Sequence, residues 1–168
     1  MISKSEREQI IALIKKEVVP AIGCTEPIAV ALCVAKATET LGERPKKISV
    51  LLSANILKNA MGVGIPGTGM IGLPIAIALG AIIGKSEYQL EVLKDCTPEA
   101  VEEGKKMIES QAIDISLKYG IEEKLYIEVK CSSDKGEATA IISGGHTHFI
   151  YVSKNEDCLL YTSPSPRD

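Results

Sequence analysis

The segment from residue 70 to residue 84, MIGLPIAIALGAIIG, constrains the fold more than any other part of this sequence. It carries no charged side chain, so a helix formed by it has no face suited to water. It is also too short and too rich in glycine to cross a bilayer, which takes about 20 apolar residues. We therefore expect a buried helix near residues 70–83, with Pro74 in its first turn.

Composition narrows the class of protein. The chain has 168 residues, of which 45% are hydrophobic and 24% are charged, as in a soluble globular domain. The formal net charge is −3 and the basic residues are scattered, so we expect no nucleic-acid partner. The charged N-terminus lacks the apolar stretch of a secretory signal. We expect a cytoplasmic protein without a membrane partner, and the sequence leaves open whether it forms a homo-oligomer.

The order of the predicted elements favours an α+β fold. Thr25 is a plausible cap for a second helix that stops at Gly42, and Thr97 is a plausible cap for a later one. We expect N-terminal helices with a Gly-rich loop, followed by a mostly antiparallel sheet. The predicted helices cover 4–18, 26–41, 70–83 and 97–110, and the predicted strands cover 46–54, 112–118, 124–130, 138–144 and 148–154.

The last residues break this pattern. LLYTSPSPRD is a Ser/Pro-rich run without periodicity, and it resembles a translated sequencing-adapter scar. We therefore predict one domain over residues 1–157 and interpret residues 158–168 as a non-native tail.

Cys24, in the stretch GCTEP, has three possible roles: a small core residue, a nucleophile or a metal ligand. A thiol just before a helix lies near unpaired backbone N–H groups and the positive end of the helix dipole, which favour the thiolate. Glu26 follows in the first turn, where it could act as a base, orient a substrate amine or simply complement the dipole.

The glycine-rich loop GVGIPGTGM lacks the Gly-Lys-Ser/Thr of a phosphate-binding loop, so it is a weak nucleotide signal. Its backbone N–H groups, including that of Gly67, could instead bind an amino-acid carboxylate, with Thr68 adding a hydroxyl, or the glycines could merely permit tight packing. Asn55, Lys58 and Asn59 lie just upstream and could line a pocket or form the wet face of a helical turn.

The stretch SGGHTHF holds both histidines of the chain, His146 and His148. In a strand, this spacing would place both rings on one face, where they could bind metal or transfer protons. Without a third ligand, however, the pair is a poor zinc signature. A functional and a structural role for His146 are equally compatible with the pattern.

Three motifs in this order, GCTEPIAVA, SANILKNAMGVGIPGTGMIGLPIA and ISGGHTHFIYV, resemble the iron–sulfur L-cysteine desulfidase family, which is related to the L-serine dehydratase alpha chain. The resemblance implies a cytoplasmic lyase without pyridoxal phosphate. Such enzymes use a 4Fe-4S cluster held by three cysteines, whose open iron acts as a Lewis acid. They eliminate sulfide from L-cysteine, giving pyruvate, ammonia and hydrogen sulfide.

The resemblance makes Cys24 the first cluster ligand. It places the other two ligands in the family's C-terminal half, so it implies that this chain is an N-terminal fragment. Cys33, Cys96, Cys131 and Cys158 stand in no matching motif. We assign Glu26 and His146 to catalysis and a further set to substrate binding. L-Serine dehydratase activity and a non-catalytic amino-acid-binding module are the alternatives. The expected substrate-binding residues are Thr25, Asn55, Lys58, Asn59, Gly67, Thr68 and Thr147.

Overall fold

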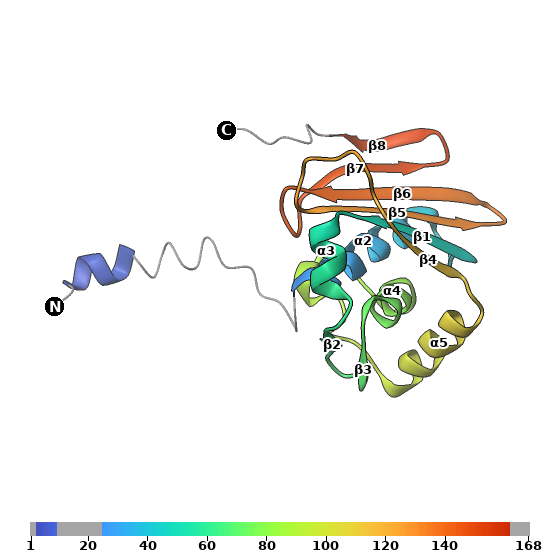
Figure 1. Ribbon diagram of the computed structural model, residues 1–168, viewed down its shortest axis with the longest axis horizontal. Coiled ribbons are helices and arrows are strands. Elements are labelled where there is room, and N and C mark those ends of the chain that lie inside the picture. The colour runs from blue at the N-terminus through green and yellow to red at the C-terminus, as the bar shows by residue number, and fades with distance from the viewer. Residues whose placement is uncertain (1–2, 10–24, 162–168) are drawn as a thin grey trace.

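The computed structural model describes residues 3–9 and 25–161. Over residues 25–161 it has one layer of helices packed on one face of a six-stranded sheet, which confirms the α+β prediction (Figure 1). The helices are α2 (Thr25–Leu41), α3 (Ala54–Ala60), α4 (Leu73–Ile82), the 3₁₀ helix η1 (Ser86–Glu91) and α5 (Pro98–Glu109). The strands are β1 (Lys47–Leu52), β2 (Gly64–Ile65), β3 (Met70–Ile71), β4 (Ile113–Leu117), β5 (Tyr126–Ser133), β6 (Gly136–Ser143), β7 (Phe149–Lys154) and β8 (Asp157–Tyr161).

Most element ends follow the sequence signals. Gly42 adopts a φ of 88° directly after α2, and the side chain of Thr97 accepts a hydrogen bond from the backbone N–H of Ala100 at 3.1 Å. Of the predicted first helix, residues 4–9 are helical, and the remainder lies outside the described residues, as does Cys24.

The sheet has the strand order β4-β1-β5-β6-β7-β8. The strands β5, β6 and β7 form the antiparallel meander expected from the sequence, and β8, which was not predicted, extends it. The predicted strand 112–118 differs, because β4 pairs in parallel with β1 at the sheet edge rather than joining the meander. The crossover through α4 and α5 returns the chain in the direction of β1, as a parallel pair requires. Residues 158–161, which the sequence assigned to the tail, lie in β8 and pair with β7 in the sheet.

The helical layer is built outward from the sheet. α2 packs on β5 and β6, α4 packs against α2, and α5 packs against α4 (Figure 1). Residues on every side of α4 are buried, as its all-apolar sequence predicts. Among the described residues, no helix has both the length and the apolar character needed to span a bilayer.

Gly80 marks the closest approach between α2 and α4. A Cβ placed there would lie 2.6 Å from the carbonyl oxygen of Ala31 and 3.2 Å from Cβ of Val34. Neither contact is with the flexible end of a long side chain, so the two helices could accept a methyl group only by moving apart. The glycine therefore sets the distance between these two core helices.

We predict that Gly80→Ala destabilises the protein. Overpacking typically costs about 1–3 kcal/mol. This exceeds the gain of up to about 1 kcal/mol in helix propensity, because here backbone must move. Thermal unfolding should show the loss as a lower Tm. Gly62→Ala is the matched control, since a Cβ at Gly62 would meet nothing within 4 Å. An unchanged Tm for Gly80→Ala would show that the interface is loose.

Candidate active site

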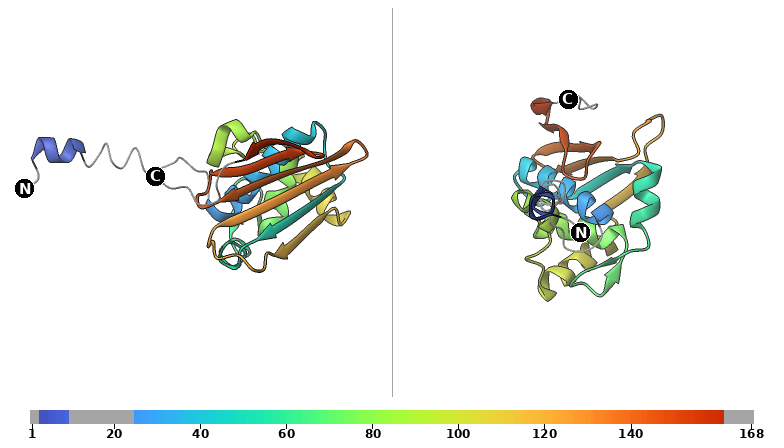
Figure 2. Two further views of the ribbon diagram at one scale, coloured as in Figure 1. Left: turned by 90° about the horizontal axis from the view of Figure 1, so that it is seen from above. Right: turned by 90° about the vertical axis from the view of Figure 1, so that its left-hand side faces the viewer.

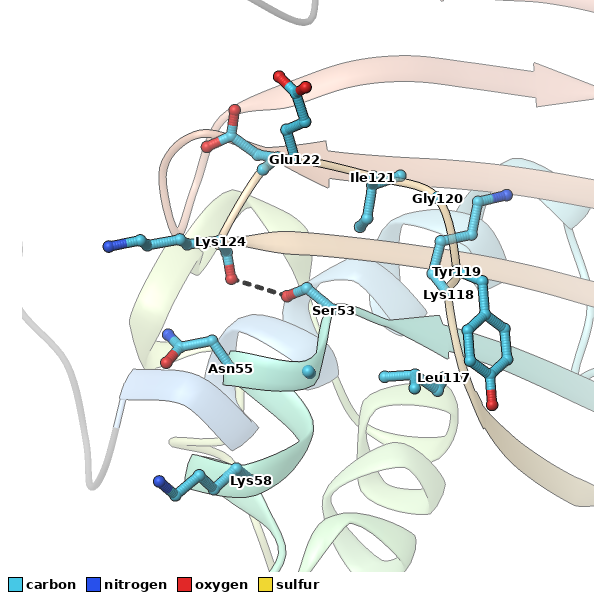
Figure 3. Close-up of a pocket in the computed structure, with 12 residues that line it drawn as sticks. Ser53, Asn55, Lys58, Leu117, Lys118, Tyr119, Gly120, Ile121, Glu122 and Lys124 are labelled. Atoms are coloured by element: carbon cyan, nitrogen blue, oxygen red, sulfur yellow. Dashed lines mark hydrogen bonds between the residues drawn. The ribbon is translucent and has the colours of Figure 1, made fainter.

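One end of the sheet, where β1 and β6 end and β5 and β7 begin, gathers segments that are far apart in the sequence. Ser53, at the end of β1, is buried and joins this strand to the start of β5. Its backbone N–H donates to the carbonyl oxygen of Tyr126 at 3.0 Å, and its hydroxyl donates to that of Lys124 at 2.8 Å. The same hydroxyl accepts from the N–H of Tyr126 at 3.2 Å, and Figure 3 shows its bond to Lys124. Ser53 thus fixes where α3 begins relative to the segment before β5.

The turn between β6 and β7 lies at the same end of the sheet. The N–H of Gly144 donates to the carbonyl oxygen of Leu125 at 3.1 Å. His146 follows in this turn, and its Nε2 lies 3.9 Å from Oε1 of Glu26 in the first turn of α2. The side chains are 35% and 24% exposed, respectively. The fold therefore brings together the two residues that the sequence assigns to catalysis.

The pair has the chemistry of a general acid–base site. Imidazole and carboxylate side chains are the groups that enzymes most often use to transfer protons. At 3.9 Å the contact is longer than a hydrogen bond, but catalytic contacts are often loose without substrate. Both groups are partly exposed, so a small molecule can reach them.

A pocket of about 560 Å³ adjoins Ser53 at this end of the sheet. Asn55 and Lys58 contribute to it from one face of α3, as their i, i+3 spacing requires. Figure 3 shows them across from Lys118 and Tyr119, which belong to the segment after β4. Lys118 also lies 3.3 Å from Glu128, so part of its charge is already neutralised. The pocket lining carries Lys58, Lys118 and Lys124 together with the carboxylates of Glu122 and Glu123.

The glycine-rich loop is not at this pocket. Gly67 and Thr68 lie in the hairpin formed by β2 and β3. The Thr68 hydroxyl donates to the carbonyl oxygen of Ile65 at 2.6 Å and accepts from the N–H of Met70 at 2.9 Å. These bonds close the hairpin, and the structure does not bring the loop together with Asn55 and Lys58. Gly67 has a φ of 81°, a turn conformation that favours glycine over other residues.

The other predicted ligand-binding residues are dispersed. Thr25 begins α2 beside Glu26, and Thr147 follows His146 in the turn, so both lie next to the acid–base pair in the chain. Asn59 is exposed on α3 and lies outside the residues that line the pocket. Both histidines lie in the turn rather than in a strand, so the predicted strand face with two imidazoles does not form.

The described cysteines are poor cluster ligands. The Cys33 thiol is buried between α2 and the sheet and donates to the carbonyl oxygen of Ala140 at 3.3 Å, and burial raises its pKa. Burial also raises the pKa of Cys131 to about 11. It raises the pKa of Cys96 as well, although this thiol is only partly buried. Across residues 3–9 and 25–161, no three His, Cys, Asp or Glu side chains gather into a possible metal site. The described residues therefore do not by themselves fit a 4Fe-4S cluster.

Two features of this end of the sheet were not predicted. Ser53 gave no signal beyond following a strand, because its role depends on a partner strand remote in sequence. The pocket wall from Leu117 to Lys124 reads as a polar connection, and only the strand pairing shows that it borders α3.

Comparisons with known proteins give the relatives of the chain. No family model matches it. It is 79% identical over 160 residues to a UPF0597 protein of Phocaeicola vulgatus, 77% identical over 158 residues to one of Bacteroides fragilis, and 63% identical over 153 residues to one of Parabacteroides distasonis. These matches cover 95%, 94% and 91% of this chain. The chain resembles UPF0597 proteins. It spans 37%, 37% and 35% of the length of these three relatives.

These relatives correct the family assignment made from the motifs. The resemblance to the iron–sulfur L-cysteine desulfidase family is wrong, because relatives covering nearly the whole chain are named UPF0597 proteins and their names mention no desulfidase. The interpretation of the chain as the N-terminal fragment of such an enzyme falls with it.

We predict that Cys33 and Cys131 resist alkylation in the folded protein. The thiolate is the reactive form, and burial raises the pKa of both groups, so little thiolate exists at pH 8. Iodoacetamide treatment followed by peptide mass spectrometry should show modified Cys158, which is exposed, and unmodified Cys33 and Cys131. In denaturant all three should react alike. Labelling of Cys33 as fast as Cys158 without denaturant would contradict the buried arrangement.

Proposed function

We propose that this chain supplies the acid–base pair of a lyase that eliminates sulfide from L-cysteine. The observation that carries the proposal is the approach of His146 to Glu26, with Nε2 and Oε1 3.9 Å apart at one end of the sheet. Residues so distant in sequence meet because α2 begins beside the β6–β7 turn. Elimination from an amino acid requires a base at the α-carbon, which such a pair provides.

In the proposed reaction, neutral His146 takes the α-proton of L-cysteine. The electron pair of the broken C–H bond forms the Cα–Cβ double bond, and the C–S bond breaks to release sulfide, which takes up a proton as hydrogen sulfide. The remaining aminoacrylate tautomerises to an imine, and water hydrolyses this to pyruvate and ammonia. The Glu26 carboxylate stabilises the imidazolium formed in the first step.

The neighbouring pocket suits the substrate carboxylate. Lys58 supplies a positive charge and Asn55 an amide donor from the same face of α3. A cavity of about 560 Å³ is much larger than one amino acid requires, so the pocket supports binding of a small substrate without selecting its side chain. L-Serine is accordingly a second candidate substrate, because a hydroxyl and a thiol differ by one atom at the β-carbon.

An iron–sulfur cluster in this lyase would take Cys24 as its one ligand among the residues named from the sequence. Cys24 lies outside the described residues, and the described cysteines do not complete a site. The other ligands would have to come from residues outside those described. The relatives are considerably longer than this chain, which leaves room for such ligands in proteins of their length. A non-catalytic amino-acid-binding module, favoured by the Lys58 and Asn55 pocket, is the alternative function.

We predict that Glu26→Gln and His146→Gln each lower kcat/KM for sulfide release by about 10²–10⁴-fold, the usual contribution of general acid–base catalysis. The assay follows sulfide and pyruvate from L-cysteine, without oxygen and after reconstitution with iron and sulfide. Glu99→Gln is the matched control, because Glu99 occupies the first turn of α5 as Glu26 occupies that of α2. This variant should retain the activity of the unsubstituted chain.

The Phocaeicola vulgatus relative is assayed in parallel, because this chain spans 37% of its length. Sulfide release by either protein supports the lyase. If neither protein turns over L-cysteine or L-serine, the lyase proposal is wrong. Calorimetric binding of L-cysteine that weakens in Lys58→Ala, without turnover, would instead establish the binding module.

A further inference from the structure

We propose that His148 is a positioning residue that holds the turn carrying His146 toward Glu26. The inference rests on the proposed function for its catalytic meaning, while its structural part can be tested without turnover. His148 was considered with His146 as half of a metal or proton-transfer pair. The structure assigns its ring a different task.

The ring of His148 is fixed by a carbonyl group. Its Nδ1 lies 2.8 Å from the carbonyl oxygen of Ser143, at the end of β6. A carbonyl oxygen only accepts, so Nδ1 must carry the proton and donate it. In the neutral ring this leaves Nε2 unprotonated. The hydrogen bond therefore sets both the orientation and the tautomer of His148.

The backbone closes the same turn. The N–H of His148 donates to the carbonyl oxygen of Gly145 at 3.1 Å, and the N–H of Ser143 donates to the carbonyl oxygen of His148 at 3.1 Å. Together with the ring, three hydrogen bonds connect His148 to the residues that precede His146. The turn can keep one conformation only while these bonds hold, since each free backbone residue gains about 1–2 kcal/mol of conformational entropy.

Glycines allow the turn to be this tight. Gly144 has a φ of 81°, and its N–H is held by Leu125. Cβ of His148 lies 3.5 Å from the position that a Cβ of Gly145 would take, so the His148 side chain packs over the turn. A register shift between Ile141 and Ile142 precedes the turn, and such irregularities redirect the residues that follow. These features place His146, between the two ends of the turn, at the distance of 3.9 Å from Glu26.

The deciding experiment compares His148→Ala with His148→Asn. Alanine removes the ring donor, whereas the asparagine side-chain N–H can replace Nδ1–H toward Ser143. NMR of the imidazole C2–H signals needs little assignment work, because His146 and His148 are the only histidines. We expect His148→Ala to shift and broaden the His146 signal and to speed exchange of the Ser143 amide by at least tenfold. His148→Asn should restore both properties.

Val101→Ala is the control for general destabilisation. It removes buried apolar atoms from α5, which packs against α4 and lies outside the His146 turn. It should lower Tm without moving the His146 signal. An unchanged His146 signal in His148→Ala, or equal effects of alanine and asparagine at position 148, would overturn the proposal.

Activity separates this inference from the proposed function. If the chain releases sulfide, His148→Ala should lower kcat by about 10–100-fold with KM changed less than about threefold, because misplacement of a catalytic group by about 1 Å has this cost. His148→Asn should recover most of kcat. If L-cysteine is not a substrate, the proposed function fails, and the NMR and exchange results still decide the role of His148.

Discussion

The close contact between α2 and α4 determines much of this structure. Gly80 lets α4 approach the backbone of α2 at Ala31, and the all-apolar α4 can then be buried between α2 and α5. Because α4 has no face suited to water, it requires helices on its flanks and cannot lie at the surface. α2 in turn packs onto β5 and β6, on the face of the sheet that the helices cover (Figure 2). Its first turn carries Glu26, which lies 3.9 Å from His146 in the β6–β7 turn.

Local signals predicted the elements and failed where partners are remote. The helix near residues 70–83, the Thr97 cap and the antiparallel meander depend on neighbouring residues, and the structure has all three. The parallel pairing of β4 with β1 depends on a crossover through two helices, and no residue in either strand encodes it. The hydroxyl of Thr68, expected at a ligand, is consumed inside its hairpin because a two-strand ribbon needs its turn closed.

The candidate site shows the same division. Glu26 and His146 were each chosen from a motif, and only the fold shows that they approach each other. Thiol chemistry follows burial rather than motif: Cys33 lies in an apolar layer that raises its pKa, so it is a packing residue with a hydrogen bond to the sheet. The family assignment from three motifs is overturned by relatives that cover nearly the whole chain. The relatives match over 153–160 residues.

The position of the acid–base pair implies how a substrate would be oriented. Glu26 and His146 approach from the helical layer and from a strand connection, whereas Asn55 and Lys58 lie on α3, which follows the end of β1. Ser53 holds α3 to the start of β5, and Gly144 holds the His146 turn to Leu125, immediately before β5. Both α3 and the His146 turn are therefore joined by hydrogen bonds to the same backbone segment, residues 124–126. In the proposed reaction, the hydrogen bonds at Ser53 and Gly144 would keep the pocket and the His146 turn in a fixed relation, and proton abstraction depends on such fixed placement.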